Sequence, residues 1–321
     1  MNEKRSSDDI GTTLTARVLL FLKGMAMGVA DSVPGVSGGT ISVMVGIYEE
    51  LIESLKNLDP LNLLSYSRRG LRGFWTGING SFLLTLLLGI ACSLYLSAGI
   101  VLTLLDTQYP QLMAFFSGLV LASTWFLRQQ VARWRRSHVY PLLGGMALTM
   151  MVAFVSPVSG SMQPLYLFLC GAVAICAMIL PGISGAFILI LLGVYDDVLM
   201  ALRAFDLPVI LVFATGCATG LLSFSHLLSW TFHYYREQTY AFLTGMLLAS
   251  VVVLWPWKHV SEGEQGMVRY LSPYGFEALT GNSAGILSAI LLLMAGFALV
   301  FIFERISRSR GQSKDTMAPE R

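Results

Sequence analysis

The stretch DSVPGVSGGTISVMVGIYEE, residues 31–50, returns later in the chain as MILPGISGAFILILLGVYDD, residues 178–197. The two copies lie 147 residues apart, and each contains P-G-x-S-G, a later glycine, a tyrosine and a closing acidic pair. A second match, between QLMAFFSGLVLAS at 111–123 and QTYAFLTGMLLAS at 238–250, follows in the same order at an offset of 127. Two ordered matches indicate a duplicated segment. The change of offset places the extra residues of the first half in the polar stretch 57–80.

Composition indicates a membrane protein. Of the 321 residues, 55% are hydrophobic and 12% are charged, whereas a soluble domain carries about 25% charged residues. Uncharged stretches occur at 81–105, 107–127, 141–195, 207–235, 238–257 and 281–303. Each is long enough to cross the hydrocarbon core, which takes about 20 residues of helix. The four cysteines lie in these apolar stretches without metal-ligand spacing, and we expect no metal, cofactor or nucleic-acid partner.

The distribution of basic residues decides the topology. The segments around the two P-G-x-S-G motifs are too long for one crossing and are interrupted at the middle. If both return to their own side and the termini are cytoplasmic, only Arg203, Lys258 and Arg269 fall outside, which leaves 18 of the 21 basic residues inside. If both cross fully, the count becomes 10 inside and 11 outside. Because basic residues concentrate on the cytoplasmic side, the sequence favours re-entrant hairpins.

The expected fold is therefore an all-α polytopic membrane protein. It consists of two inverted repeats, each with a re-entrant broken helical hairpin and three transmembrane helices, as in many secondary transporters. The predicted parts are a cytoplasmic tail at 1–15, a first repeat at 16–156 with its hairpin at 16–55, a second repeat at 165–304 with its hairpin at 165–202, and a cytoplasmic tail at 305–321.

The hairpin tips are the candidate binding site. Proline lacks an N–H group and disfavours helix before it, so we expect the breaks at Pro34, Gly35, Pro181 and Gly182. The returning arms would present free N–H groups and hydroxyls, which suit an anion. The predicted phosphate-binding residues are Ser37, Gly38, Gly39, Thr40, Ser184, Gly185 and Ala186. The alternative is that the glycines only allow close packing while the serines cap their own helices.

Asp31 is a second candidate, because an ionisable residue at this depth of a membrane is functional by default. It could couple transport to a proton or a sodium ion, pair with a substrate cation, or cap the turn before Pro34. Its counterpart in the second copy is Met178, which is apolar.

Two other classes of function compete with lipid transport. A small-anion transporter or channel would share the inverted repeat and the hairpins. An intramembrane serine hydrolase would use the G-x-S-G pattern, but its serine needs a base, and His226 is the only plausible one within the membrane. We expect no enzyme activity and no catalytic residue.

The paired motifs DSVPGVSGGT and LPGISGAFILILLGVY, with the Q-x-x-A-F-x-x-G segments after them, resemble the polyprenyl-phosphate transporter family over about residues 17–305. The resemblance implies a multi-pass protein of the bacterial inner membrane. Its expected activity is flipping undecaprenyl phosphate back to the cytoplasmic leaflet for cell-wall and glycan synthesis. The expected partners are this lipid and the membrane lipids, and a homo-oligomer is compatible with the sequence. Ala186 and Phe187 stand where the first copy has Gly39 and Thr40, so the two tips need not contact phosphate equally.

Overall fold

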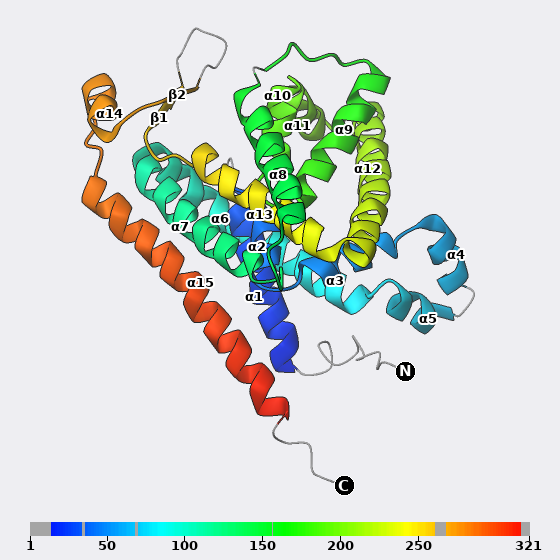
Figure 1. The fold of residues 1–321 in the computed structure, drawn as a ribbon. Helices are drawn as coiled ribbons and strands as arrows, with labels where there is room; N and C mark the ends of the chain where they lie inside the picture. Colours follow the sequence, from blue (N-terminus) through cyan, green and yellow to red (C-terminus); the bar gives the residue numbers. More distant parts are fainter. Residues whose placement is uncertain (1–13, 34–35, 68–69, 156, 261–267, 316–321) are drawn as a thin grey trace. The chain divides into compact units, whose positions relative to one another are not determined.

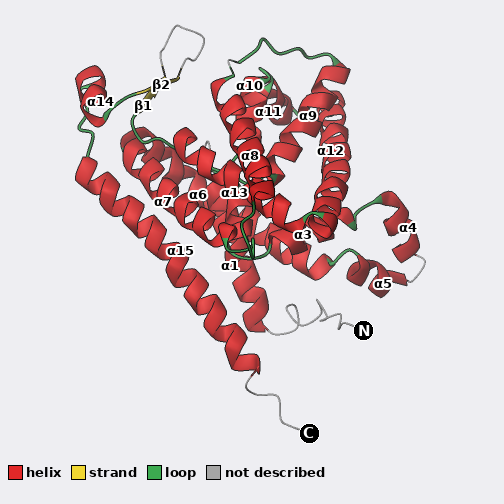
Figure 2. Cartoon of the chain, viewed as in Figure 1, coloured by secondary structure: helices red, strands yellow, loops and turns green. Residues whose placement is uncertain are grey.

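The computed structural model describes residues 14–33, 36–67, 70–155, 157–260 and 268–315. The chain is mostly helical in these ranges, with one pair of short strands (Figure 2). By length and composition, four helices of the described residues can cross a membrane by themselves; they are α6 (Gly80–Thr107), α7 (Tyr109–Arg128), α8 (Arg136–Phe154) and α12 (Leu207–Tyr234). The chain is therefore a multi-pass membrane protein built from α-helices.

The bounds of the long helices follow the sequence offset of 127. Helices α6 and α12 both have 28 residues, and their first residues, Gly80 and Leu207, are 127 apart. The next helices, α7 and α13 (Arg236–Val253), start 127 apart as well. Two short helices, α4 (Pro60–Ser67) and α5 (Gly70–Gly77), lie side by side in the stretch that the first half has in addition (Figure 1).

The hairpin helices follow the offset of 147. The entering arms are α1 (Leu14–Asp31) and α9 (Pro164–Ile179). The returning arms begin with α2 (Gly38–Met44) and α10 (Gly185–Leu191), whose bounds match residue for residue under this offset. The arms continue as α3 (Tyr48–Lys56) and α11 (Tyr195–Ala204), which also start 147 residues apart.

Besides the break at the tip, each hairpin has a second break within its returning arm, which the sequence pattern did not predict. Gly46 and Gly193, the matched glycines before the repeated tyrosines, have φ of 71° and 65°. Glycine adopts this left-handed conformation without steric cost, so the helix ends there. In the second hairpin, α10 and α11 are bent by 108°. The first part of each returning arm has seven residues, or about 10 Å of helix.

The contacts divide the chain into two compact units, and the first is residues 1–42, 46–102 and 158–236. It contains both hairpins. Helix α1 packs on α6 and α9 packs on α12, with glycines at both contacts. A Cβ on Gly24 would meet the backbone of Leu86, and one on Gly171 would lie 2.5 Å from the carbonyl oxygen of Phe213. Small residues allow this close approach of helices inside a membrane.

The second unit comprises residues 43–45, 103–157 and 237–321. Helix α7 packs along α15 (Ile286–Asp315), and Gly145 on α8 and Gly245 on α13 bring those two helices into backbone contact. Between α13 and α15 lie β1 (Lys258–Val260) and β2 (Val268–Tyr270), an antiparallel pair, and α14 (Pro273–Thr280). The two strands are a small departure from the expected all-helical chain.

Candidate functional site

The tips of the two hairpins meet within the first unit. The Ser37 hydroxyl has one hydrogen to donate, and it lies within hydrogen-bond distance of two carbonyl oxygens, that of Met178 at 3.1 Å and that of Leu180 at 3.3 Å. In the other direction, the Gly182 N–H donates to Thr40 Oγ1 at 3.0 Å. The structure thus brings together residues that are more than 140 positions apart in the sequence.

In the first tip, the expected free donors are bonded within the protein. The Gly38 N–H donates to Asp31 Oδ1 at 2.6 Å, and the Gly39 N–H donates to Ser37 Oγ at 3.1 Å. Ser37, Gly38, Gly39 and Thr40 are all buried. Asp31 therefore caps the start of α2, seven residues along the chain, and its polar partner is a backbone N–H.

The second tip is built differently. Met178 replaces the aspartate, and Ser184, the N-cap residue of α10, makes no side-chain capping bond. Ser184 and Gly185 are buried, whereas Ala186 is exposed. Gly182 has a φ of 90°, a left-handed conformation that separates the helices of the two arms. Pro181 is buried beside it. The corresponding break residues of the first hairpin, Pro34 and Gly35, lie outside the described residues.

The glycines of the tips are close to other atoms of the protein. A Cβ on Gly39 would lie 2.5 Å from the carbonyl oxygen of Ile179 in the other hairpin. One on Gly38 would meet the Asp31 carboxylate, and one on Gly185 would lie 2.8 Å from the carbonyl oxygen of Ala174. Close packing between and within the hairpins thus needs glycine at these positions.

A polar cleft between α3 and α12 was not anticipated from the sequence. It has a volume of about 810 Å³, and its lining residues are Glu49, Ile52, Glu53, Lys56, His226, Ser229, Trp230, Phe232, His233, Tyr234 and Arg236. The sequence offered one signal, because polar residues recur every three or four positions along α3 and the end of α12 and so share a helix face.

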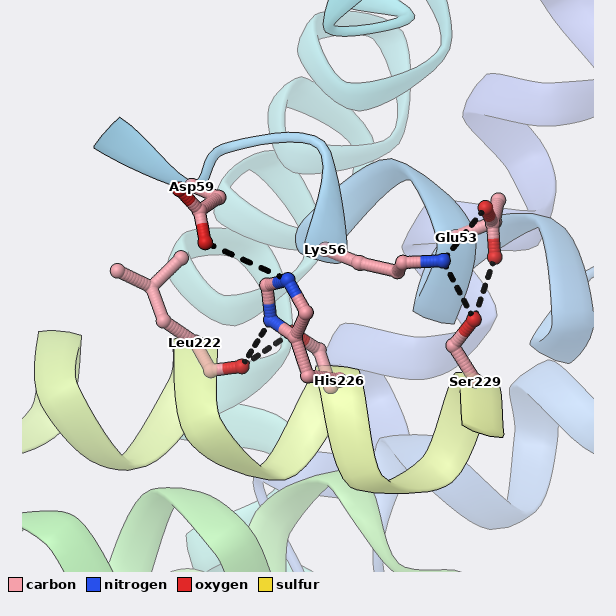
Figure 3. Close-up of polar contacts among 7 residues, drawn as sticks. Glu53, Lys56, Asp59, Leu222, His226 and Ser229 are labelled. Atoms are coloured by element: carbon pink, nitrogen blue, oxygen red, sulfur yellow. Dashed lines mark hydrogen bonds and ion pairs between the residues drawn. The ribbon is translucent and has the colours of Figure 1, made fainter. Parts of the chain in front are cut away.

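Figure 3 shows how side chains of this cleft pair across the two helices. The Ser229 hydroxyl donates to Glu53 Oε2 at 2.8 Å, and Lys56 Nζ lies 3.0 Å from Ser229 Oγ and 3.3 Å from Glu53 Oε1. The His226 ring lies between Asp59, with Nε2 3.4 Å from the carboxylate, and the carbonyl oxygen of Leu222.

Among the described residues, no hydrogen bond joins either motif serine to a histidine or another base. The hydrogen-bond partners of the Ser37 hydroxyl are backbone groups, while His226 bonds to Asp59 and Leu222. Within the described ranges, no three His, Cys, Asp or Glu side chains are grouped so that they could hold a metal ion. The arrangement is that of a polar contact between two broken helices, with a charged cleft in the same unit.

Comparisons with known proteins point to one family. The sequence profile of the undecaprenyl phosphate translocase-like family matches residues 27–268. A "Polyprenyl-phosphate transporter" of Vibrio cholerae is 43% identical over 295 residues, which cover 89% of this chain and 95% of that protein. A protein of the same description from Staphylococcus aureus is 29% identical over 255 residues, covering 73% of this chain and 85% of that protein. No solved structure gives a significant match.

Proposed function

Because the chain belongs to the undecaprenyl phosphate translocase-like family, we propose that it moves undecaprenyl phosphate between the leaflets of the bacterial inner membrane. The proposed net direction returns the carrier from the outer to the cytoplasmic leaflet, where it serves cell-wall and glycan synthesis again. The headgroup needs a polar path because a phosphate cannot cross hydrocarbon unaided, whereas the prenyl tail can stay in the lipid.

The contact between the two hairpin tips is the observation that carries the proposal. Backbone groups released by a helix break are tolerated at membrane depth only when they are buried in protein or line a polar cavity. Here the broken segments of both halves join through Ser37, Thr40 and Gly182. Broken helices that meet at the repeat interface form the substrate sites of many secondary transporters.

We propose the inverted topology together with this function. The charge count favours cytoplasmic termini and hairpins that enter from opposite faces. The equal bounds of α6 and α12, and of α2 and α10, support a duplicated unit. Three crossings per half would then turn the second repeat upside down, so that one packing arrangement can open alternately to either side.

In the proposed transport cycle, the phosphate binds at the tips to Ser37, Gly38, Gly39, Thr40, Ser184, Gly185 and Ala186. In this structure the Asp31 carboxylate accepts the hydrogen bond that the Gly38 N–H donates. A phosphate oxygen that accepts this hydrogen bond must displace the Asp31 carboxylate. Because the carboxylate then lacks its partner, we propose that it binds a proton or another cation. Such an exchange would couple lipid movement to a proton or a sodium ion.

The experiment uses cells that lack this protein and any redundant carrier. We expect undecaprenyl phosphate to accumulate in the outer leaflet, and the cells to become more sensitive to compounds that capture the exposed lipid. Restoring the gene should reverse both effects. An unchanged leaflet distribution would remove the proposal and favour a soluble anion as cargo.

A further inference from the structure

The cleft between α3 and α12 carries charged and polar groups that the tip contact does not use. On α3, Glu49, Glu53 and Lys56 follow one another at spacings of four and three, and so lie on one face. The facing residues His226, Ser229, His233 and Arg236 have spacings of three and four. The volume of about 810 Å³ lies within the range of small-molecule sites, about 300–1,000 Å³.

Two donors of this cleft converge on one carboxylate. Lys56 Nζ and Ser229 Oγ lie 3.0 Å apart, and each contacts a different oxygen of Glu53, at 3.3 Å and 2.8 Å (Figure 3). An anion with several oxygens that entered between Lys56 and Ser229 would find both donors already in place. The Glu53 carboxylate holds the position of that anion.

This carboxylate is held weakly enough to be exchanged. The Glu53 side chain is 56% exposed and that of Lys56 is 33% exposed, and exposed ion pairs contribute little to stability. The other acids have their own partners, because Glu49 contacts Arg236 at 2.8 Å and Asp59 contacts His226 at 3.4 Å. An incoming anion therefore has to displace Glu53 alone.

We propose that the cleft binds the phosphate monoester headgroup of a lipid, with Lys56 and Ser229 as its donors and Glu53 as an internal stand-in for the phosphate. A phosphate monoester accepts charge-assisted hydrogen bonds as the Glu53 carboxylate does, and it carries more negative charge and one more acceptor oxygen than a carboxylate. Arg236, whose guanidinium contacts Glu49 at 2.8 Å, lines the same cleft and places a further positive charge there.

The polar residues that the second half contributes to the cleft are not repeated in the first half. Under the offset of 127, the positions that correspond to His226, Ser229, His233 and Arg236 are Gly99, Leu102, Asp106 and Tyr109. In the proposed topology the site lies on the cytoplasmic side, where a headgroup arrives after leaving the tips. Trp230 and Tyr235, whose rings lie 5.5 Å apart, fit such a position, because these residues are enriched at membrane interfaces. The lipid's identity as the polyprenyl carrier rests on the proposed function.

The test compares two variants of one ion pair, Glu53→Gln and Lys56→Gln, in the purified full-length chain in detergent. Binding of a short-chain prenyl monophosphate is measured by calorimetry, with the matching prenyl alcohol as the phosphate-free control. Glu53→Gln removes the competitor, so we expect several-fold tighter binding. Lys56→Gln removes a charge-assisted hydrogen bond, so we expect binding to weaken about tenfold or more.

The matched control is Arg203→Gln, at the position of the second hairpin that corresponds to Lys56 under the offset of 147. It removes the same charge from an exposed site outside the cleft, and binding should not change. If Lys56→Gln does not fold, Ser229→Ala removes the other donor and should also weaken binding.

Opposite changes in binding affinity for the two variants support the site, because breaking a purely structural ion pair would weaken binding in both. Shifts in the same direction, or none, overturn it. If phosphatidate binds as tightly as the prenyl monophosphate, the cleft is a site for phosphate-bearing lipids in general. If inorganic phosphate binds as tightly, the assignment of the site to lipids is overturned. A chain that binds through the cleft but moves no lipid refutes the proposed function alone. A chain that moves lipid while both variants bind normally refutes the cleft alone.

Discussion

Replacing Gly39 with alanine should push the two hairpin tips apart. The added Cβ would lie 2.5 Å from the carbonyl oxygen of Ile179 and 3.1 Å from Ser37 Oγ. A comfortable C···O contact is about 3.3–3.6 Å, so the backbone of one tip must move by about 1 Å. Overpacking of this kind costs about 1–3 kcal/mol. This corresponds to a roughly 5- to 150-fold shift away from the closed tip contact.

The assay is the apparent melting temperature in detergent, followed by lipid transport in vesicles. Gly99→Ala is the matched control, because its Cβ would meet nothing within 4 Å and alanine is favoured over glycine in a helix by about 0.5–1 kcal/mol. We expect Gly39→Ala to melt at a lower temperature and to transport less, while Gly99→Ala stays at least as stable as the parent. If the two variants behave alike, the tips do not depend on this close contact.

Three further predictions concern topology, the motif serines and pH. A cysteine at Ser67 should react only from the cytoplasm and one at Ser159 only from outside; labelling of both from one side would exclude the inverted repeat. Ser37→Ala removes the hydrogen bond that its hydroxyl shares between two carbonyl oxygens of the other hairpin, worth about 1 kcal/mol, so it should lower the melting temperature more than Ser184→Ala, whose hydroxyl makes no capping bond. Equal losses would contradict this asymmetry. Burial lowers the pKa of Lys258 from 10.5 to about 8, so the unfolded chain binds more protons between these values and the free energy of unfolding should rise with pH there. Lys258→Met should remove this rise, and a rise that persists would place its origin elsewhere.

The helices could be located from the sequence because their signals are local or repeated. The sequence match at an offset of 127 lies in α7 and α13, the match at an offset of 147 includes α2 and α10, and the polar stretch 57–80, where extra residues were expected, contains α4 and α5. The second break of each returning arm was missed, although Gly46 and Gly193 are matched by the repeat. A glycine in an apolar stretch can serve close helix packing or a left-handed turn, and the sequence alone does not distinguish the two.

The candidate site was predictable only in part. The P-G-x-S-G motifs located the tips, but whether a backbone N–H group there is free depends on its hydrogen-bond partner in the fold. The Gly38 N–H bonds to Asp31, on the other side of the break, and the motif did not predict this contact. The cleft was missed because its contacts between the two sides join residues far apart in the sequence: Glu53 with Ser229, Asp59 with His226, and Glu49 with Arg236. The sequence singled out His226 only as a possible base within the membrane, whereas the fold places Asp59 beside it.

Transport of the lipid by the purified protein tests the central claim most directly. The full-length chain is reconstituted into vesicles that carry undecaprenyl phosphate, and the share of lipid accessible to a membrane-impermeant reagent that captures its headgroup is followed with time. We predict that lipid from the inner leaflet becomes accessible only in vesicles that contain the protein, and more slowly with Gly39→Ala. Lipid accessibility that stays at the level of protein-free vesicles would contradict the account, and uptake of a soluble anion such as sulfate by the same vesicles would identify the alternative cargo.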